Sequence, residues 1–232
     1  TIPINVESPH PMKNQLTETT LANGLKVFLK EIHTAPIISS WLWYRVGSRD
    51  EVQGQTCIAH WVEHMQFKGT PQFPANLLDK AISREGGAWN AMTYLDWTAY
   101  FETMPADKID LGLRLEADRM LNSQFDPSEV ASERTVIISE REGGENEPLF
   151  MLGEAVQQTA FRMHPYHHEV IGDMADLRTM TRDDLITIST RELEKLPADE
   201  LEVIVRHFQT EDRAERAQQL AAVVAQYLPL GL

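Results

Sequence analysis

One short pattern limits the fold of this chain more than any other: H-x-x-E-H, formed by His60, Glu63 and His64. Residues three and four apart share one face of an α-helix, so a helix here brings the three side chains together. Two imidazoles and a carboxylate on one helical stripe can bind Zn²⁺ and activate a bound water. The spacing inverts H-E-x-x-H and occurs in zinc peptidases. A pair of solvated or core-packed histidines is the alternative.

Composition sets the class of protein. The chain has 232 residues, of which 42% are hydrophobic and 24% charged, as expected for a soluble globular protein. The net charge of −14 argues against nucleic acid and anionic lipid surfaces as partners. Nothing approaches the roughly 18 consecutive apolar residues of a membrane span. The sequence favours a cytoplasmic location, or export if a leader has been trimmed.

The single cysteine, Cys57, excludes an internal disulfide. Its place just before the histidines raises the question of a metal ligand. A small buried thiol is the commoner role for a free cysteine, and we interpret Cys57 as structural.

The succession of sequence patterns predicts an α+β domain, with a mostly antiparallel β-sheet and helices packed mainly on one face. Alternating segments on both sides of Asn23-Gly24 predict a β-hairpin. The nearly continuous apolar segment 36–46 predicts a central strand buried on both faces, with Trp41 and Trp43 in the core. Residues rich in Thr, Tyr, Trp and Phe predict two strands within 88–104, with a turn near Leu95-Asp96.

Helical patterns occupy most of the rest of the chain. They predict helices at 74–83, 106–121, 126–142, 148–163 and 181–193, and Gly143-Gly144 is expected to end the third of these. A strand at 201–208 and an amphipathic helix at 211–228 follow. Because no low-complexity linker divides the sequence, residues 1–232 are expected to form a single domain.

A zinc site with two histidines needs a third protein ligand. His167 and His168 are adjacent in a predicted loop, where solvation is their expected state. The helix predicted from residue 126 offers four glutamates: Glu129, Glu133, Glu140 and Glu142. Glu133 and Glu140 are two turns apart and share a face. Spacing alone does not choose between them, and a solvated acidic stripe is the alternative.

Five segments, in order along the chain, give a family resemblance. They lie at residues 60–70, 90–101, 116–120, 133–140 and 164–172, with sequences HWVEHMQFKGT, NAMTYLDWTAYF, EADRM, ERTVIISE and HPYHHEVIG. Together they make the chain resemble the inverted-zincin peptidases of the pitrilysin type, which include the mitochondrial processing peptidases and insulin-degrading enzymes. The resemblance covers most of the chain.

The resemblance implies a role for each matching residue. His60 and His64 would be zinc ligands, with Glu140 as the third ligand of one Zn²⁺ per chain. Glu63 would be the general base and Glu133 a supporting acid of the catalytic site. Asn90 and Ala91, with Thr93 beside them, match the edge strand that pairs with bound peptide.

The resemblance also implies partners. Working enzymes of this family place two such domains across a cleft, and the chain resembles the zinc-bearing half only. We therefore expect a peptide substrate and a homologous second domain or subunit, or a homo-oligomer. The expected function is that of a zinc-dependent endopeptidase acting on peptides or short unfolded polypeptides. The alternatives are a non-catalytic scaffold or assembly subunit of the same fold, and an isolated half that binds zinc without processing substrate.

Overall fold

A computed structural model describes residues 16–20, 26–30 and 35–193. Two antiparallel sheets form in this part of the chain. The first pairs β1 (Leu16–Thr20) with β2 (Lys26–Lys30). The second has the order β3-β5-β4 and contains β3 (Ile37–Tyr44), β4 (Ala88–Thr93) and β5 (Thr98–Pro105). The predicted hairpin is confirmed in its strands, whereas its Asn23-Gly24 turn lies outside the described residues.

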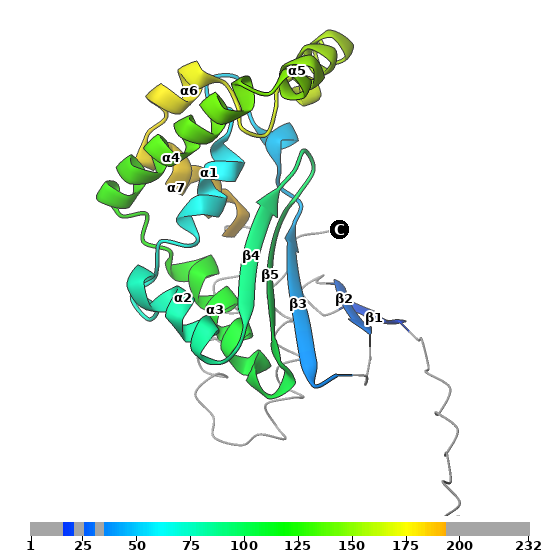
Figure 1. Ribbon diagram of the computed structural model, residues 1–232, viewed down its shortest axis with the longest axis vertical. Coiled ribbons are helices and arrows are strands. Elements are labelled where there is room, and N and C mark those ends of the chain that lie inside the picture. The colour runs from blue at the N-terminus through cyan, green and yellow to red at the C-terminus, as the bar shows by residue number, and fades with distance from the viewer. Residues whose placement is uncertain (1–15, 21–25, 31–34, 194–232) are drawn as a thin grey trace, which may run out of the picture.

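Seven α-helices occur in the described residues, and the larger sheet carries helices on one face (Figure 1). They are α1 (Ile58–Met65), α2 (Ala75–Arg84), α3 (Ile109–Asn122), α4 (Pro127–Glu145), α5 (Pro148–Ala160), α6 (Met174–Thr179) and α7 (Arg182–Leu193). Helices α2 and α3 lie against that face, and α1 packs between the sheet and helices α4 and α7. The α+β prediction is confirmed.

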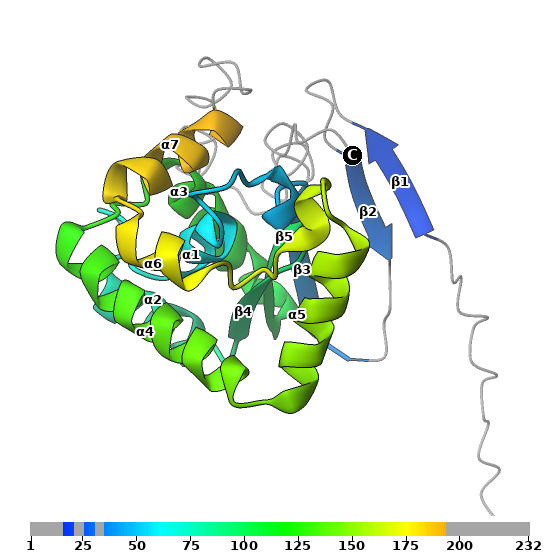
Figure 2. The same ribbon diagram turned by 90° about the horizontal axis from the view of Figure 1, so that it is seen from above.

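Two apolar cores hold these layers together. The first surrounds α1 and is made by residues of α1, α4, α6 and α7, with Trp61, Met65 and Ile137 fully buried at its centre. Seen from above, these helices enclose α1 (Figure 2). The second core lies under α2 and α3 and contains Leu78 and Ile82. The helix that carries the H-x-x-E-H pattern is therefore packed against the sheet on one side and against α4 and α7 on others.

Helix α4 begins as the sequence predicts and ends later. Asp126 caps it, since its carboxylate accepts the N–H of Ser128 at 2.8 Å, and Pro127 occupies the first turn. The prediction that Gly143-Gly144 ends the helix is wrong, because α4 continues through both glycines to Glu145. An ion pair at 3.0 Å between Arg141 and Glu145 spans that last turn and helps hold it.

The prediction that the strand within residues 36–46 is buried on both faces is also wrong. β3 is at an edge of its three-stranded sheet among the described residues, and alternate side chains along it are exposed. Trp41 and Trp43 are each 43% exposed rather than core residues. Their rings stack on each other, and Trp41 also stacks on Phe101 with the ring centroids 4.2 Å apart. Aromatic stacking along one sheet face explains the apolar run without burial on both faces.

The strand predicted at 201–208 and the helix at 211–228 lie outside the described residues. Among the residues that are described, no helix has the length and apolar character needed to cross a membrane.

Candidate metal centre and active site

The apolar side of helix α1 packs into the first core and fixes the helix in place. Ile58, Trp61 and Met65 are spaced three and four residues apart and are at most 2% exposed. The same periodicity places His60 and His64 together on another side of the helix. Burial of one stripe therefore fixes the direction in which both imidazoles project.

The first turn of α1 is fixed by a carboxylate from outside the helix. The two oxygens of Glu51 accept the N–H groups of Cys57 and Ala59, each at 2.9 Å. These are donors that a helix start leaves without partners. Cys57, the N-cap residue, has a left-handed φ of 73°. Gly172 packs so closely against this residue that a Cβ at position 172 would lie only 2.6 Å from the Cβ of Cys57. Burial raises the pKa of Glu51 to about 8, against the opposing effect of its two N–H donors.

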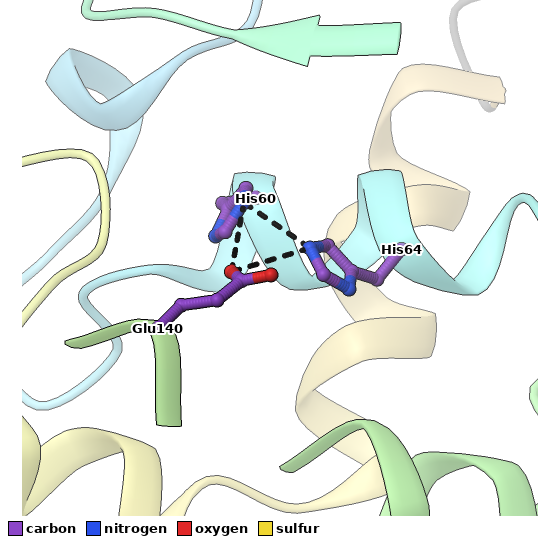
Figure 3. A group of neighbouring side chains, drawn as sticks. All are labelled: His60, His64 and Glu140. Atoms are coloured by element: carbon purple, nitrogen blue, oxygen red, sulfur yellow. Dashed lines mark hydrogen bonds and ion pairs between the residues drawn. The ribbon is translucent and has the colours of Figure 1, made fainter. Parts of the chain in front are cut away.

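Helices α1 and α4 bring together a group of three possible metal ligands, His60, His64 and Glu140 (Figure 3). The two histidine Nε2 atoms are 3.2 Å apart. Oε2 of Glu140 lies 3.9 Å from Nε2 of His60 and 3.7 Å from Nε2 of His64. In Figure 3 the carboxylate of Glu140 points toward both rings. Three ligating atoms from two segments about 80 residues apart in sequence thus converge on one small space.

Glu133 fixes the orientation of the His64 ring. Its Oε2 is 2.8 Å from Nδ1 of His64, and its Oε1 is 2.5 Å from the ammonium of Lys68. Burial alone would raise the pKa of Glu133, but hydrogen bonds from Lys68 and His64 lower it below its usual value. An ionised carboxylate only accepts hydrogen bonds, so Nδ1 of His64 carries the proton. With Nδ1 bound to Glu133, Nε2 is the ring nitrogen that faces His60 and Glu140.

The donor set fits a zinc ion. Tetrahedral Zn²⁺ with bonds of about 2.0–2.2 Å separates its ligands by roughly 3.3–3.6 Å, close to the three distances above. Burial, followed by the neighbouring His64, lowers the pKa of His60 to about 3, so this imidazole is neutral at physiological pH. Two imidazoles and a carboxylate, with one histidine hydrogen-bonded to an acid, form a common zinc ligand set.

Glu63 lies beside this group, between α1 and β4. It is 8% exposed, and its Oε2 accepts the hydroxyl of Thr93 at 2.5 Å. Burial raises the pKa of Glu63, and the hydrogen bond from Thr93 opposes that effect. A buried carboxylate with a raised pKa next to a metal site is suited to exchange a proton at neutral pH.

Strand β4 is the other edge of the described sheet, opposite to β3. An edge strand has backbone groups available to pair with an extended peptide. Asn90 and Ala91 lie in the middle of β4, and the side-chain Oδ1 of Asn90 accepts the N–H of Ala91 at 2.9 Å. The predicted substrate-binding role of Asn90, Ala91 and Thr93 stays a prediction.

Sequence reasoning missed three contributors to the site. Lys68 follows the H-x-x-E-H pattern by one turn, which was a signal that it lies near the histidines. Glu51 and the Thr93 hydroxyl contribute through tertiary hydrogen bonds, which the spacing of residues in the sequence does not predict. Cys57 is fully buried, as its interpretation as a structural thiol requires. Solvation was the expected state of His167 and His168, of which at most one could readily point inward. His168 does point inward, since it is 3% exposed and lies 3.7 Å from the carboxylate of Glu51.

Comparison with known sequences gives one family. The family described as Insulinase (Peptidase family M16) matches residues 26–174. A zinc protease of Helicobacter pylori, PqqE, is 37% identical over 168 residues, which cover 72% of this chain and 38% of that protein. A probable mitochondrial-processing peptidase subunit beta of Arabidopsis thaliana is 30% identical over 187 residues, covering 77% of this chain and 35% of that protein. The chain spans less than two fifths of the length of these relatives.

Solved structures show the same fold. The crystal structure of a protease from Helicobacter pylori matches 76% of this chain and 43% of that chain with a TM-score of 0.72 and 36% identity. A structure titled as a peptidase M16 inactive domain from Pseudomonas fluorescens matches 75% of this chain and 43% of that chain with a TM-score of 0.71. At 18% identity the second match concerns the fold alone.

Proposed function

Because this chain belongs to peptidase family M16, the insulinase family, we propose that it is the zinc-bearing domain of a metalloendopeptidase. The observation that carries the proposal is the convergence of His60, His64 and Glu140, with Glu63 beside them. The relatives named zinc proteases support the same chemistry. The proposed reaction is hydrolysis of peptide bonds in peptides or short unfolded polypeptides.

The residues divide the work of hydrolysis. His60, His64 and Glu140 would hold one Zn²⁺, which when bound lowers the pKa of a water and polarises the substrate carbonyl. Glu63 would take one proton from the attacking water as its oxygen bonds to the carbonyl carbon. It would then give that proton to the amide nitrogen as the C–N bond breaks, so that a carboxylic acid and an amine are released. Glu133 keeps His64 in the tautomer that presents Nε2.

The edge strand supports the choice of substrate class. An extended peptide added to β4 would form backbone hydrogen bonds that do not depend on its sequence. Thr93 at the end of β4 touches Glu63, so this strand leads directly to the proposed general base. Unfolded segments meet this requirement because their backbone groups are free to pair. Residues 1–232 are proposed to form one domain that works with a homologous second half, supplied by another domain, another subunit or a second copy.

The function is tested with Glu63→Gln and the matched control Glu142→Gln, an exposed glutamate of α4. We expect Glu63→Gln to keep its zinc and to lose peptidase activity by a factor on the order of 10²–10⁴, because it removes only the proton acceptor. Glu142→Gln should behave as wild type. Activity is measured on a fluorogenic peptide, and zinc by elemental analysis. The chain is assayed alone, where we expect little turnover, and with a second half added.

The outcomes separate the candidate functions. Wild-type turnover that survives in Glu63→Gln would contradict the role of that residue. Protein that takes up no zinc at equimolar metal would favour the non-catalytic scaffold of the same fold. Zinc uptake with turnover only in the presence of the second half would identify this chain as a half that cannot work alone.

A further inference from the structure

The general base is held by a residue outside its own helix. Glu63 lies on α1, and the hydroxyl of Thr93 on β4 donates to its Oε2 at 2.5 Å. A carboxylate that is 8% exposed needs hydrogen bonds to replace the water it has lost. A hydrogen bond between a hydroxyl and a carboxylate at this distance is a short, charge-assisted one. It ties the carboxylate to the sheet rather than leaving it free to rotate about its last torsion.

Thr93 is itself fixed from behind by Thr98. The two residues face each other in the register of β4 and β5, and their Oγ1 atoms are 3.3 Å apart. Thr98 is 5% exposed and lies closer, at 2.9 Å, to the carbonyl oxygen of Val46, which can only accept a hydrogen bond. Because the carboxylate of Glu63 can only accept, the one hydrogen of the Thr93 hydroxyl is directed to Glu63, and the oxygen of Thr93 can accept a hydrogen bond from Thr98.

We propose that Thr93 is a positioning residue, whose hydroxyl holds Oε2 of Glu63 and leaves Oε1 as the oxygen that exchanges the proton. This inference rests on the proposed peptidase function. Preorganisation of this kind acts on the rate of the chemical step, because a misoriented base still permits substrate to bind. The hydroxyl of Thr93 then acts through Glu63, whereas peptide pairing along β4 would use backbone groups.

The first experiment compares Thr93→Val, Thr93→Ser and Thr103→Val in the zinc-loaded chain supplied with its second half. Val has the shape of Thr without the hydroxyl, and Ser keeps the hydroxyl. Thr103 is the control, since its hydroxyl bonds Ser39 elsewhere in the same sheet. We expect Thr93→Val to lower kcat roughly 10–100-fold with KM unchanged, the loss typical for a residue that orients a catalytic group. Thr93→Ser should recover most of the rate, and Thr103→Val should lose none.

The second experiment needs no activity. It measures the melting temperature of the metal-free chain for Thr93→Val, Glu63→Leu and the double variant. We expect Thr93→Val to lower the melting temperature by roughly 3–10 °C when Glu63 is present, because it leaves a buried carboxylate without its donor. In the Glu63→Leu background the same change should have little effect.

The results separate this inference from the proposed function. An active wild type whose Thr93→Val variant keeps its kcat, or loses affinity for substrate instead, overturns the positioning role alone. Additive melting temperatures overturn the contact on which it depends. A wild type that hydrolyses no peptide even with its second half overturns the proposed function, and the inference falls with it.

Discussion

At the scale of single residues, four glutamates of the site occupy four different positions. Glu140 faces the two histidine rings, Glu133 backs one of them, Glu63 lies beside them against the sheet, and Glu51 caps their helix. Burial differs accordingly, because Glu140 is exposed while the other three are not. An exposed carboxylate costs little to leave ionised and can meet a cation, whereas the buried ones depend on their hydrogen bonds.

The ring of His64 gives a prediction about zinc affinity. Glu133→Gln removes the carboxylate that selects the tautomer of His64, so we expect zinc to bind about 10–100-fold more weakly, without being lost. Glu129→Gln is the matched control, since both glutamates contact Lys68, at 3.7 Å for Glu129, and only Glu133 contacts His64. Competition with a chromophoric chelator measures both affinities. Equal weakening in the two variants would assign the effect to Lys68 instead.

Residue roles were accessible to sequence reasoning to different degrees. The pairing of His60 with His64 follows from helical period, and the structure places both where that period requires. The choice between Glu133 and Glu140 does not follow from spacing, because seven residues put both on one face. The fold distinguishes the two by where α4 crosses α1, since Glu140 lies near the Nε2 atoms and Glu133 contacts Nδ1 of His64. A crossing between helices is a tertiary property, and the family resemblance was needed to anticipate it.

At the scale of elements, α1 is a short helix that tertiary contacts stabilise. Eight residues are too few for a stable isolated helix, and the N-cap position is a Cys57 in a left-handed conformation. Stability comes from the buried side chains of Trp61 and Met65 and from Glu51 at the first turn. The sequence pattern predicted the helix and a cap near Thr56, one residue before the observed N-cap, but not the carboxylate of Glu51 that accepts its first N–H groups.

The capping carboxylate gives a prediction about pH. Burial raises the pKa of Glu51 to about 8 in the folded chain, above its ordinary value near 4.5. The folded state therefore binds a proton that the unfolded state releases, so this contribution to stability is full below about pH 4.5 and is lost as pH rises to 8. His168, Asp50 and Asp176 are the other ionisable groups around this carboxyl.

Urea unfolding of the metal-free chain between pH 5 and 8 tests whether Glu51 makes stability depend on pH in this way. As the pH rises, we expect the free energy of unfolding of wild type to fall more steeply than that of Glu51→Gln. The difference in slope should be at most about 1.4 kcal/mol per pH unit. Val52→Ala, at a position that is 60% exposed, serves as the control with a wild-type slope. Parallel pH profiles for wild type and Glu51→Gln would show that the carboxyl is ionised throughout.

The strands and helices were predicted better than the contacts that they make with neighbouring elements. Asp126-Pro127 and the turn near Leu95-Asp96 carry local chemistry that fixes a boundary, and α4, β4 and β5 begin or end there. The two errors concern neighbours. Whether β3 is central depends on which strand lies beside it, and whether α4 stops at Gly143-Gly144 depends on the contacts of the last turn. Hydrophobic periodicity in the sequence predicts neither the neighbours of β3 nor the contacts of the last turn of α4.

At the scale of the whole molecule, the fold brings three distant segments to one point. Residues 60–64, 93 and 133–140 come from a helix, a sheet edge and a second helix, and the packing of α1 against β4 and α4 joins them. The chain spans less than two fifths of its relatives, so this point is proposed to be one side of a larger catalytic cleft. The three possible metal ligands, in contrast, all lie within the described residues.

The position of a bound zinc ion tests this account most directly. Crystals of the zinc-loaded chain, measured at the zinc absorption edge, should show one anomalous peak at about 2.0–2.2 Å from Nε2 of His60, Nε2 of His64 and a carboxylate oxygen of Glu140. A zinc ion held elsewhere, or crystals with no peak at equimolar zinc, would contradict it.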